Sequence, residues 1–122
     1  MRKIYGLAIF VMVIGIIISS GCGRVETYGD RVMNRNMTPI NDIISDQGRY
    51  DGKDVTVKGK IDIECGTGCW FILKEGAATL YIDIEPAGFA IPQKVGRNAV
   101  VEGVISVVEG KPRLTGKAVE IR

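Results

Sequence analysis

Hydrophobic and polar residues alternate strictly along the stretch from Asp54 to Glu64. The apolar positions share one parity, which continues to Cys65 and comprises Val55, Val57, Gly59, Ile61 and Ile63. A period of two predicts a strand with one buried side and one side in water. Gly59 interrupts the apolar side, and a glycine inside a strand often marks a bend or a close backbone approach. A long strand bent in its middle suits a small barrel, in which one strand serves both halves of the sheet.

Four further strands are predicted, over residues 70–74, 78–85, 98–108 and 113–121. Prolines at both ends of residues 86–92 exclude a strand interior there, because proline donates no backbone hydrogen bond. That connection offers Phe89 and Ile91 as candidate core residues. The predicted fold class is therefore mainly β, a small five-stranded barrel, with a small open sandwich as the alternative.

A short helix of about ten residues is predicted before the first strand. Thr38 would be its N-cap, with proline in the first helical position, and Gly48 would end it. Isoleucines at positions 40, 43 and 44 have helical spacing and would dock on the barrel.

The first 22 residues have the three-part pattern of a secretory signal. A basic start at Arg2 and Lys3 precedes an apolar run of 15 residues, which is short for a spanning helix of ~20. An uncleaved membrane anchor is the alternative. The sequence Ser19-Ser20-Gly21-Cys22 resembles the lipobox of prokaryotic lipoproteins, which implies cleavage before Cys22 and diacylglycerol on its sulfur. Two acyl chains suffice for stable membrane anchoring.

Three regions follow from these patterns: a signal peptide (1–21), the lipidated Cys22 with a flexible tether (22–37), and the barrel domain (38–122). We expect the mature protein in the cell envelope, anchored to the membrane on its extracytoplasmic side. The tether is polar and lacks periodicity.

Two stretches, 55–61 (VTVKGKI) and 100–105 (VVEGVI), resemble the first and fourth strands of anticodon-binding-type oligonucleotide/oligosaccharide-binding (OB) domains. The resemblance covers residues 54–121 and implies a fold, whereas the ligand stays open because this fold hosts many functions. One departure is that OB domains place a helix between strands three and four, and here the helix precedes strand one.

Charge and composition limit the classes of function that we expect for this protein. The formal net charge of +2 includes Arg2 and Lys3, and without them 14 basic residues balance 14 acidic residues. A neutral chain lacks the electrostatic footprint of a nucleic-acid binder, so we expect no nucleic-acid partner. There is no histidine, and no nucleophile–base pair or phosphate-binding loop is evident. We therefore expect neither an enzyme nor a cofactor.

The segment from Cys65 to Trp70 (CGTGCW) resembles a group of uncharacterised exported OB-like domains with Gly-Cys-Trp in the first hairpin. Three roles are open for Cys65 and Cys69. An oxidising compartment and a glycine-rich spacer favour a disulfide. Two thiolates also suit copper or zinc, with Met33 and Met37 as further thioether ligands for copper. A redox-active pair is the third role, although such pairs usually have a two-residue spacer.

The single tryptophan, Trp70, is predicted to face outward from the second strand, near Tyr81 on the third. An exposed aromatic pair is a stacking platform, unless both faces of the strand are covered. Lys58 and Lys60, on the wet side of the first strand, complete the candidate ligand face. We expect a lipid-anchored module that binds or scaffolds an unidentified protein or small molecule. The alternatives are a thiol-based metal-handling lipoprotein and a nucleic-acid-binding OB domain.

Overall fold

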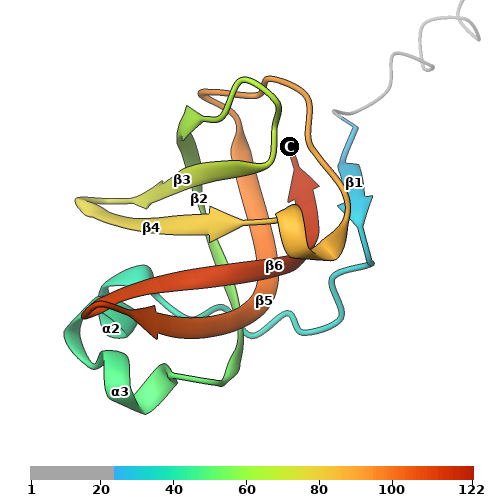
Figure 1. Cartoon of the computed structure of the whole chain (residues 1–122). Helices are drawn as coiled ribbons and strands as arrows, with labels where there is room; N and C mark the ends of the chain where they lie inside the picture. Colours follow the sequence, from blue (N-terminus) through green and yellow to red (C-terminus); the bar gives the residue numbers. More distant parts are fainter. Residues whose placement is uncertain (1–23) are drawn as a thin grey trace, which may run out of the picture.

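The computed structural model describes residues 24–122, which form a closed five-stranded barrel with one further strand outside it (Figure 1). The barrel strands are β2 (Asp54–Glu64), β3 (Trp70–Glu75), β4 (Ala78–Asp83), β5 (Asn98–Val108) and β6 (Lys111–Ile121). Their order is β6-β4-β3-β2-β5, and pairing of β5 with β6 closes the barrel. Only the β4–β6 pair is parallel among these barrel pairs. The predicted mainly β fold class, with a closed barrel and a short N-terminal helical segment, is confirmed.

The predicted signal peptide and Cys22 lie outside the described residues. Within residues 24–122, no helix has the length and apolarity needed to cross a membrane.

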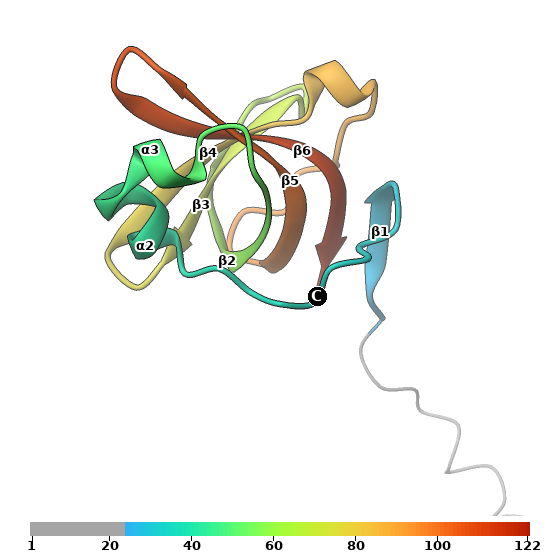
Figure 2. The same cartoon turned by 90° about the horizontal axis from the view of Figure 1, so that it is seen from below.

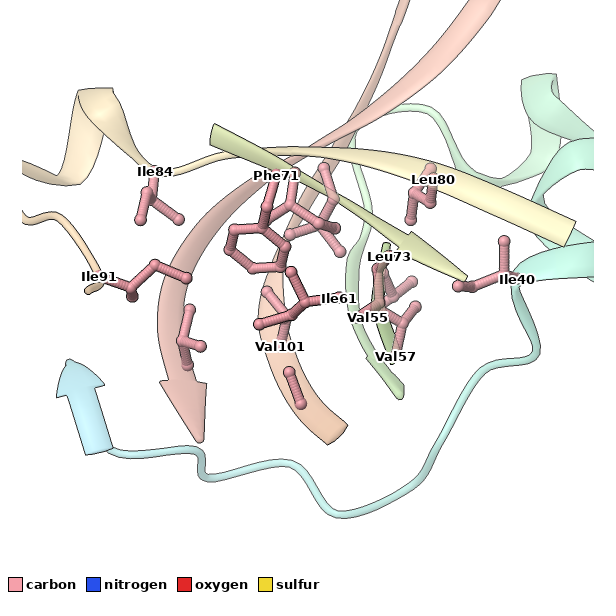
Figure 3. Packing of buried hydrophobic residues seen from close by; sticks show 14 of the residues in the cluster. Ile40, Val55, Val57, Ile61, Phe71, Leu73, Leu80, Ile84, Ile91 and Val101 are labelled. Atoms are coloured by element: carbon pink, nitrogen blue, oxygen red, sulfur yellow. The ribbon is translucent and has the colours of Figure 1, made fainter. Parts of the chain in front are cut away.

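The core fills the barrel from end to end (Figure 3). Phe71 lies near its middle, close to Ile61, and both side chains are fully buried. Ile91, 3% exposed, lies at one end, and Ile40 from the helical segment lies at the other. The connection between β4 and β5 therefore contributes a core residue, as predicted for Ile91, while Phe89 is only half-buried. That connection contains a short 3₁₀ helix, η2 (Glu85–Ala87).

The bend predicted at Gly59 has a steric cause, and the same cause applies at Gly103 of β5. A Cβ at Gly59 would lie 2.5 Å from the carbonyl oxygen of Lys74, and one at Gly103 would lie 2.1 Å from that of Thr115. Neighbouring backbone thus approaches β2 and β5 too closely for any side chain at these positions.

The helical segment consists of α2 (Ile40–Ser45) and α3 (Gln47–Tyr50). Ile40 and Ile43 are fully buried, as their spacing predicts. The prediction of Thr38 as N-cap is wrong, because Pro39 takes that position and the Ile40 N–H donates to Glu75 Oε1 at 2.9 Å. The predicted stop at Gly48 is also wrong. The chain turns at residue 46 and continues into α3, so that α2 packs on β4 while α3 packs on β5.

Along β2, the alternation of inward and outward side chains shifts by one residue after Ile61. Ile61 pairs with Leu73 but Ile63 pairs with Ile72, so Asp62 is the extra residue of a β-bulge. The bulge turns Ile63 outward, to 54% exposure, which corrects the prediction that Ile63 is buried.

The N-terminal part differs from the predicted flexible tether over residues 22–37. Strand β1 (Glu26–Gly29) pairs antiparallel with the end of β6. Residues 30–39, which we call the strap, then run along the barrel to α2 (Figure 2). Its Val32 is 3% exposed and packs with Val100 and Ala118.

Two buried carboxylates hold the strap. Glu102, 5% exposed, accepts hydrogen bonds from the N–H groups of residues 33 and 34 at 3.1 and 3.0 Å. Glu120, also 5% exposed, accepts two hydrogen bonds from the Arg35 guanidinium, one of them 2.9 Å long. The strap also covers Thr56, which alternation places on the wet side of β2 but which is fully buried. Met33 and Met37 lie on this non-helical segment, and Met33 is 78% exposed.

Candidate functional site

The outward side chains of β3 and β4 bring two aromatic rings together. Phe71 and Leu73 of β3 point into the core, so Trp70 points outward, as predicted, and Ile72 does the same. Because Ile72 pairs with Tyr81 across β3 and β4, Trp70 is a diagonal neighbour of Tyr81. The two rings stack, with centroids 5.5 Å apart and planes inclined by 24°. Both residues are half-buried.

A cation extends this pair. Arg113 of β6 pairs with Tyr81 of β4, and its Cζ lies 5.3 Å from the centroid of the Tyr81 ring. Since β4 lies between β3 and β6, Arg113 and Trp70 flank Tyr81 from opposite sides. Ile72 and the outward-turned Ile63 continue the surface toward β2. We call these five residues the aromatic face.

The aromatic face is ordered by contacts within the protein. Burial raises the pKa of Tyr81 and the Asp83 carboxylate raises it further, while Arg113 lowers it, and the hydroxyl is therefore neutral at pH 7. The stack of Trp70 on Tyr81 already restricts both side chains, so a ligand would order fewer rotamers on binding. The arrangement is a preformed stacking platform beside hydrogen-bonding groups.

The cysteine loop lies between β2 and β3, at one end of this face. The Gly68 N–H donates to the Cys65 carbonyl at 2.9 Å, which closes a tight turn. Gly68 has a φ of +72°, and a Cβ there would lie 2.0 Å from the carbonyl oxygen of Ile91. The Ile91 N–H donates to the Gly68 carbonyl at 3.1 Å, and Gln93 Nε2 donates to the Cys65 carbonyl at 2.9 Å. The β4–β5 connection thus holds the loop from outside.

The two thiols meet inside the loop. The Sγ atoms of Cys65 and Cys69 lie 3.1 Å apart, and the Thr67 hydroxyl lies 3.2 Å from the first and 3.3 Å from the second. The hydrogen bond from the Thr67 hydroxyl, followed by the Thr67 backbone N–H and the Cys69 thiol, lowers the pKa of Cys65 to about 7. Both cysteines are half-buried. The disulfide between them stays a prediction, for which the loop holds the partners in contact.

Metal ligation by the same thiols would need further ligands for zinc. Within residues 24–122, no group of three or more histidine, cysteine or acidic side chains is arranged to hold a metal ion.

The residues of the predicted ligand face lie at two separate places on the barrel. Trp70 and Tyr81 stand together on β3 and β4. Lys58 and Lys60 instead line a groove of about 690 Å³ that neither aromatic residue lines. The groove also includes Lys74 of β3 and Arg122 after β6.

Sequence reasoning missed two residues of the aromatic face. Arg113 follows a hairpin turn and has outward parity in the last strand, so alternation alone could have placed it outside. Its position beside Tyr81 depends on the parallel β4–β6 pairing, which joins strands far apart in the sequence. Ile63 was missed because a bulge leaves no mark in the alternation.

Comparisons with known proteins bear on the fold. No protein-family model matches the sequence, and no curated protein matches it. Among solved structures, the hypothetical protein ygiW from E. coli is 15% identical, with a TM-score of 0.52, over 78% of this chain and 99% of that one.

Two synthetases are also similar in structure. Asparaginyl-tRNA synthetase from Pyrococcus horikoshii is 14% identical, with a TM-score of 0.56, over 70% of this chain and 23% of that one. A putative aspartyl-tRNA synthetase from Leishmania major Friedlin is 13% identical, with a TM-score of 0.55, over 75% of this chain and 22% of that one. At such identities the likeness concerns the fold and not the activity. The barrel of residues 54–121 is an OB fold.

Proposed function

We propose that this protein is a lipid-anchored, extracytoplasmic OB-fold binding module that carries out no reaction of its own. The observation that supports a binding role is the stack of Trp70, Tyr81 and Arg113 on the outside of β3, β4 and β6. In OB folds, the face of the second and third barrel strands, with the loops between strands one and two and between strands four and five, binds oligonucleotides and oligosaccharides. The aromatic face occupies that position, and the cysteine loop is the first of the two loops.

The net charge of the chain favours oligosaccharides over oligonucleotides as the ligand. From Cys22 onward the chain has no net charge, whereas binding to nucleic acid draws on an excess of positive charge along the phosphates. A pyranose ring has an apolar C–H side that fits a flat aromatic ring, and its hydroxyls would meet Arg113 and Asp83 beside the stack. We therefore propose an oligosaccharide as the ligand of the aromatic face.

The anchor would hold the barrel close to the membrane. Strand β1 begins at Glu26, four residues after Cys22, a distance of at most roughly 14 Å for extended chain. Because β1 and the strap are ordered, the distance from Cys22 to the barrel is set by the few residues before β1 and not by the whole of residues 22–37. In a Cys22→Ala variant, we expect the precursor to stay unprocessed and unlipidated. Normal acyl labelling of that variant would contradict lipid anchoring.

Binding at the aromatic face is testable with defined probes. We expect oligosaccharides of glucose or N-acetylglucosamine to change the fluorescence of Trp70, the single tryptophan. By calorimetry, Trp70→Ala and Tyr81→Ala should each weaken binding about tenfold, or about 1.4 kcal/mol, which corresponds to roughly 55 Å² of apolar ring surface covered by the sugar.

The matched control is Val108→Ala, which removes a 44%-exposed apolar side chain of β5 outside the aromatic face. It should leave the affinity unchanged. Equal affinities of the Trp70→Ala variant and the parent protein would refute the role of the aromatic face.

A further inference from the structure

Three lysines of β2 and β3 stand together on the outer surface of the barrel. Lys60 and Lys74 are directly opposite each other in the antiparallel β2–β3 pair. Lys58 shares the side of Lys60, since Gly59 between them faces inward, and all three lysines are exposed. Like charges directly opposite on neighbouring strands destabilise a sheet. The fold therefore maintains a local repulsion here.

No carboxylate of the described residues forms an ion pair with these lysines. The ion pairs within residues 24–122 involve only four cationic side chains, those of Arg35, Lys94, Lys117 and Arg122. Arg122 is loosely paired, 3.6 Å from a Glu120 carboxylate that Arg35 already engages. Lys58, Lys60 and Lys74 are thus free to face an external anion.

The same residues line the groove of about 690 Å³ described above, a size typical of small-molecule sites. Lys58, Lys60, Lys74 and Arg122 supply its four cations, against the carboxylates of Asp62 and Glu75. Glu75 is turned toward α2, where its Oε1 accepts the Ile40 N–H. The groove lining thus has two more cationic than acidic side chains, in a chain that is neutral from Cys22 onward, and one of the cations, Arg122, is also the one that is loosely paired with Glu120.

We propose that this groove binds the phosphate group of a small phosphate ester, with Lys60 and Lys74 as the principal ligands of the anion. A doubly charged phosphate between the two ammonium groups would replace their repulsion with two attractions, and lysine is a common phosphate ligand. The site is separate from the aromatic face, so it does not depend on that face binding a sugar.

The phosphate has two chemical sources, a soluble ester or a lipid head group. Arg122 follows Ile121, whose pairing partner is Glu26 at the start of β1. If Cys22 is the lipid anchor, as proposed above, this end of the groove lies near the bilayer surface. The experiment therefore has one arm for each source.

The test uses the chain from residue 22 with Cys22→Ser, which keeps every described residue and removes the lipid. Binding of sn-glycerol 3-phosphate is measured by calorimetry. Binding to vesicles of phosphatidic acid in phosphatidylcholine, whose phosphate is likewise a monoester, is measured by co-sedimentation, with pure phosphatidylcholine vesicles as the blank. We expect Lys60→Gln/Lys74→Gln to bind at least tenfold more weakly than the parent. The control, Lys53→Gln/Lys111→Gln, has the same change in charge on two exposed lysines outside the groove and should bind like the parent.

A second measurement needs no ligand. In low-salt chloride buffer, Lys74→Gln should raise the thermal unfolding midpoint, because it removes the repulsion with Lys60, while Lys111→Gln should leave the midpoint unchanged. Groove-dependent binding of glycerol phosphate alone identifies a soluble ester, and such binding to vesicles identifies a lipid head group. Absence of binding in both arms, or an equal loss in the control variant, would overturn the proposal.

Discussion

Gly68 is the position at which a single methyl group should separate the cysteine loop from the barrel. Its φ of +72° is a left-handed conformation, and its Cα lies against the β4–β5 connection. In a Gly68→Ala variant, the new Cβ would lie 2.0 Å from the Ile91 carbonyl oxygen. Either the turn must change its conformation or Ile91 must move away from the end of the core.

The expected loss of stability combines three contributions. A left-handed conformation costs a residue with a Cβ about 1–2 kcal/mol. Loss of the Ile91–Gly68 backbone hydrogen bond costs about 0.5–1.5 kcal/mol. Ile91 is 3% exposed, and exposing it fully would cost about 1.5–3 kcal/mol. The loop can shift and so avoid part of these costs. We therefore expect the free energy of unfolding to fall by about 2–5 kcal/mol, which is a large share of the ~5–15 kcal/mol typical of a folded protein.

Urea denaturation followed by Trp70 fluorescence and circular dichroism measures this loss. Gly66→Ala is the matched control, since it adds the same methyl group two residues away, where nothing lies within 4 Å and φ is not positive. The control should change the free energy of unfolding by less than about 0.5 kcal/mol. Equal stability of the two variants would show that the contact between Gly68 and Ile91 does not hold the loop.

Three further predictions concern the thiols and the strap. Protein taken from the envelope with its thiols blocked should show by intact mass a Cys65–Cys69 disulfide, whereas two alkylated thiols with bound copper or zinc would indicate the metal-handling alternative. After reduction, alkylation of Cys65 should accelerate as pH rises through its pKa of about 7, and Thr67→Val should raise the pH of that transition. For the strap, the Arg35 hydrogen bonds lower the pKa of Glu120 below its ordinary value of 4.5, so its stabilising contribution is present above pH 4.5 and is lost as the pH falls through the lowered pKa. In Glu120→Gln, the unfolding midpoint should depend less on pH over that acidic range, and an unchanged pH dependence would contradict the role of the ion pair.

Local patterns carried most of the information about the barrel. All five barrel strands were predicted from the sequence, most clearly over Asp54–Glu64, where a half-buried strand needs one apolar parity and the chain supplies it. Gly59 marked the bend in β2, since the close approach of the Lys74 backbone tolerates no side chain there. Helical spacing likewise identified Ile40 and Ile43 as core residues.

Other features arose only when distant segments met. Residues 30–37 are polar and aperiodic, and their order depends on Glu102 and Glu120, whose sequence positions lie 68 to 85 residues away. The bulge that exposes Ile63 results from the register between β2 and β3. Neither cause leaves a periodic pattern in the local sequence.

The candidate sites also have some features that the local sequence determines and others that depend on contacts between distant segments. The sequence by itself indicated that Trp70 faces outward and that Cys65 and Cys69 share a tight turn, because parity and glycine spacing are local properties. Only the tertiary structure showed that Arg113 lies beside the Tyr81 ring. It also showed that Lys58 and Lys60 line a groove with Lys74, the pairing partner of Lys60, and are not part of the aromatic face. Such neighbours are set by strand order and register, which come from burying the whole core at once and not from any one stretch of chain.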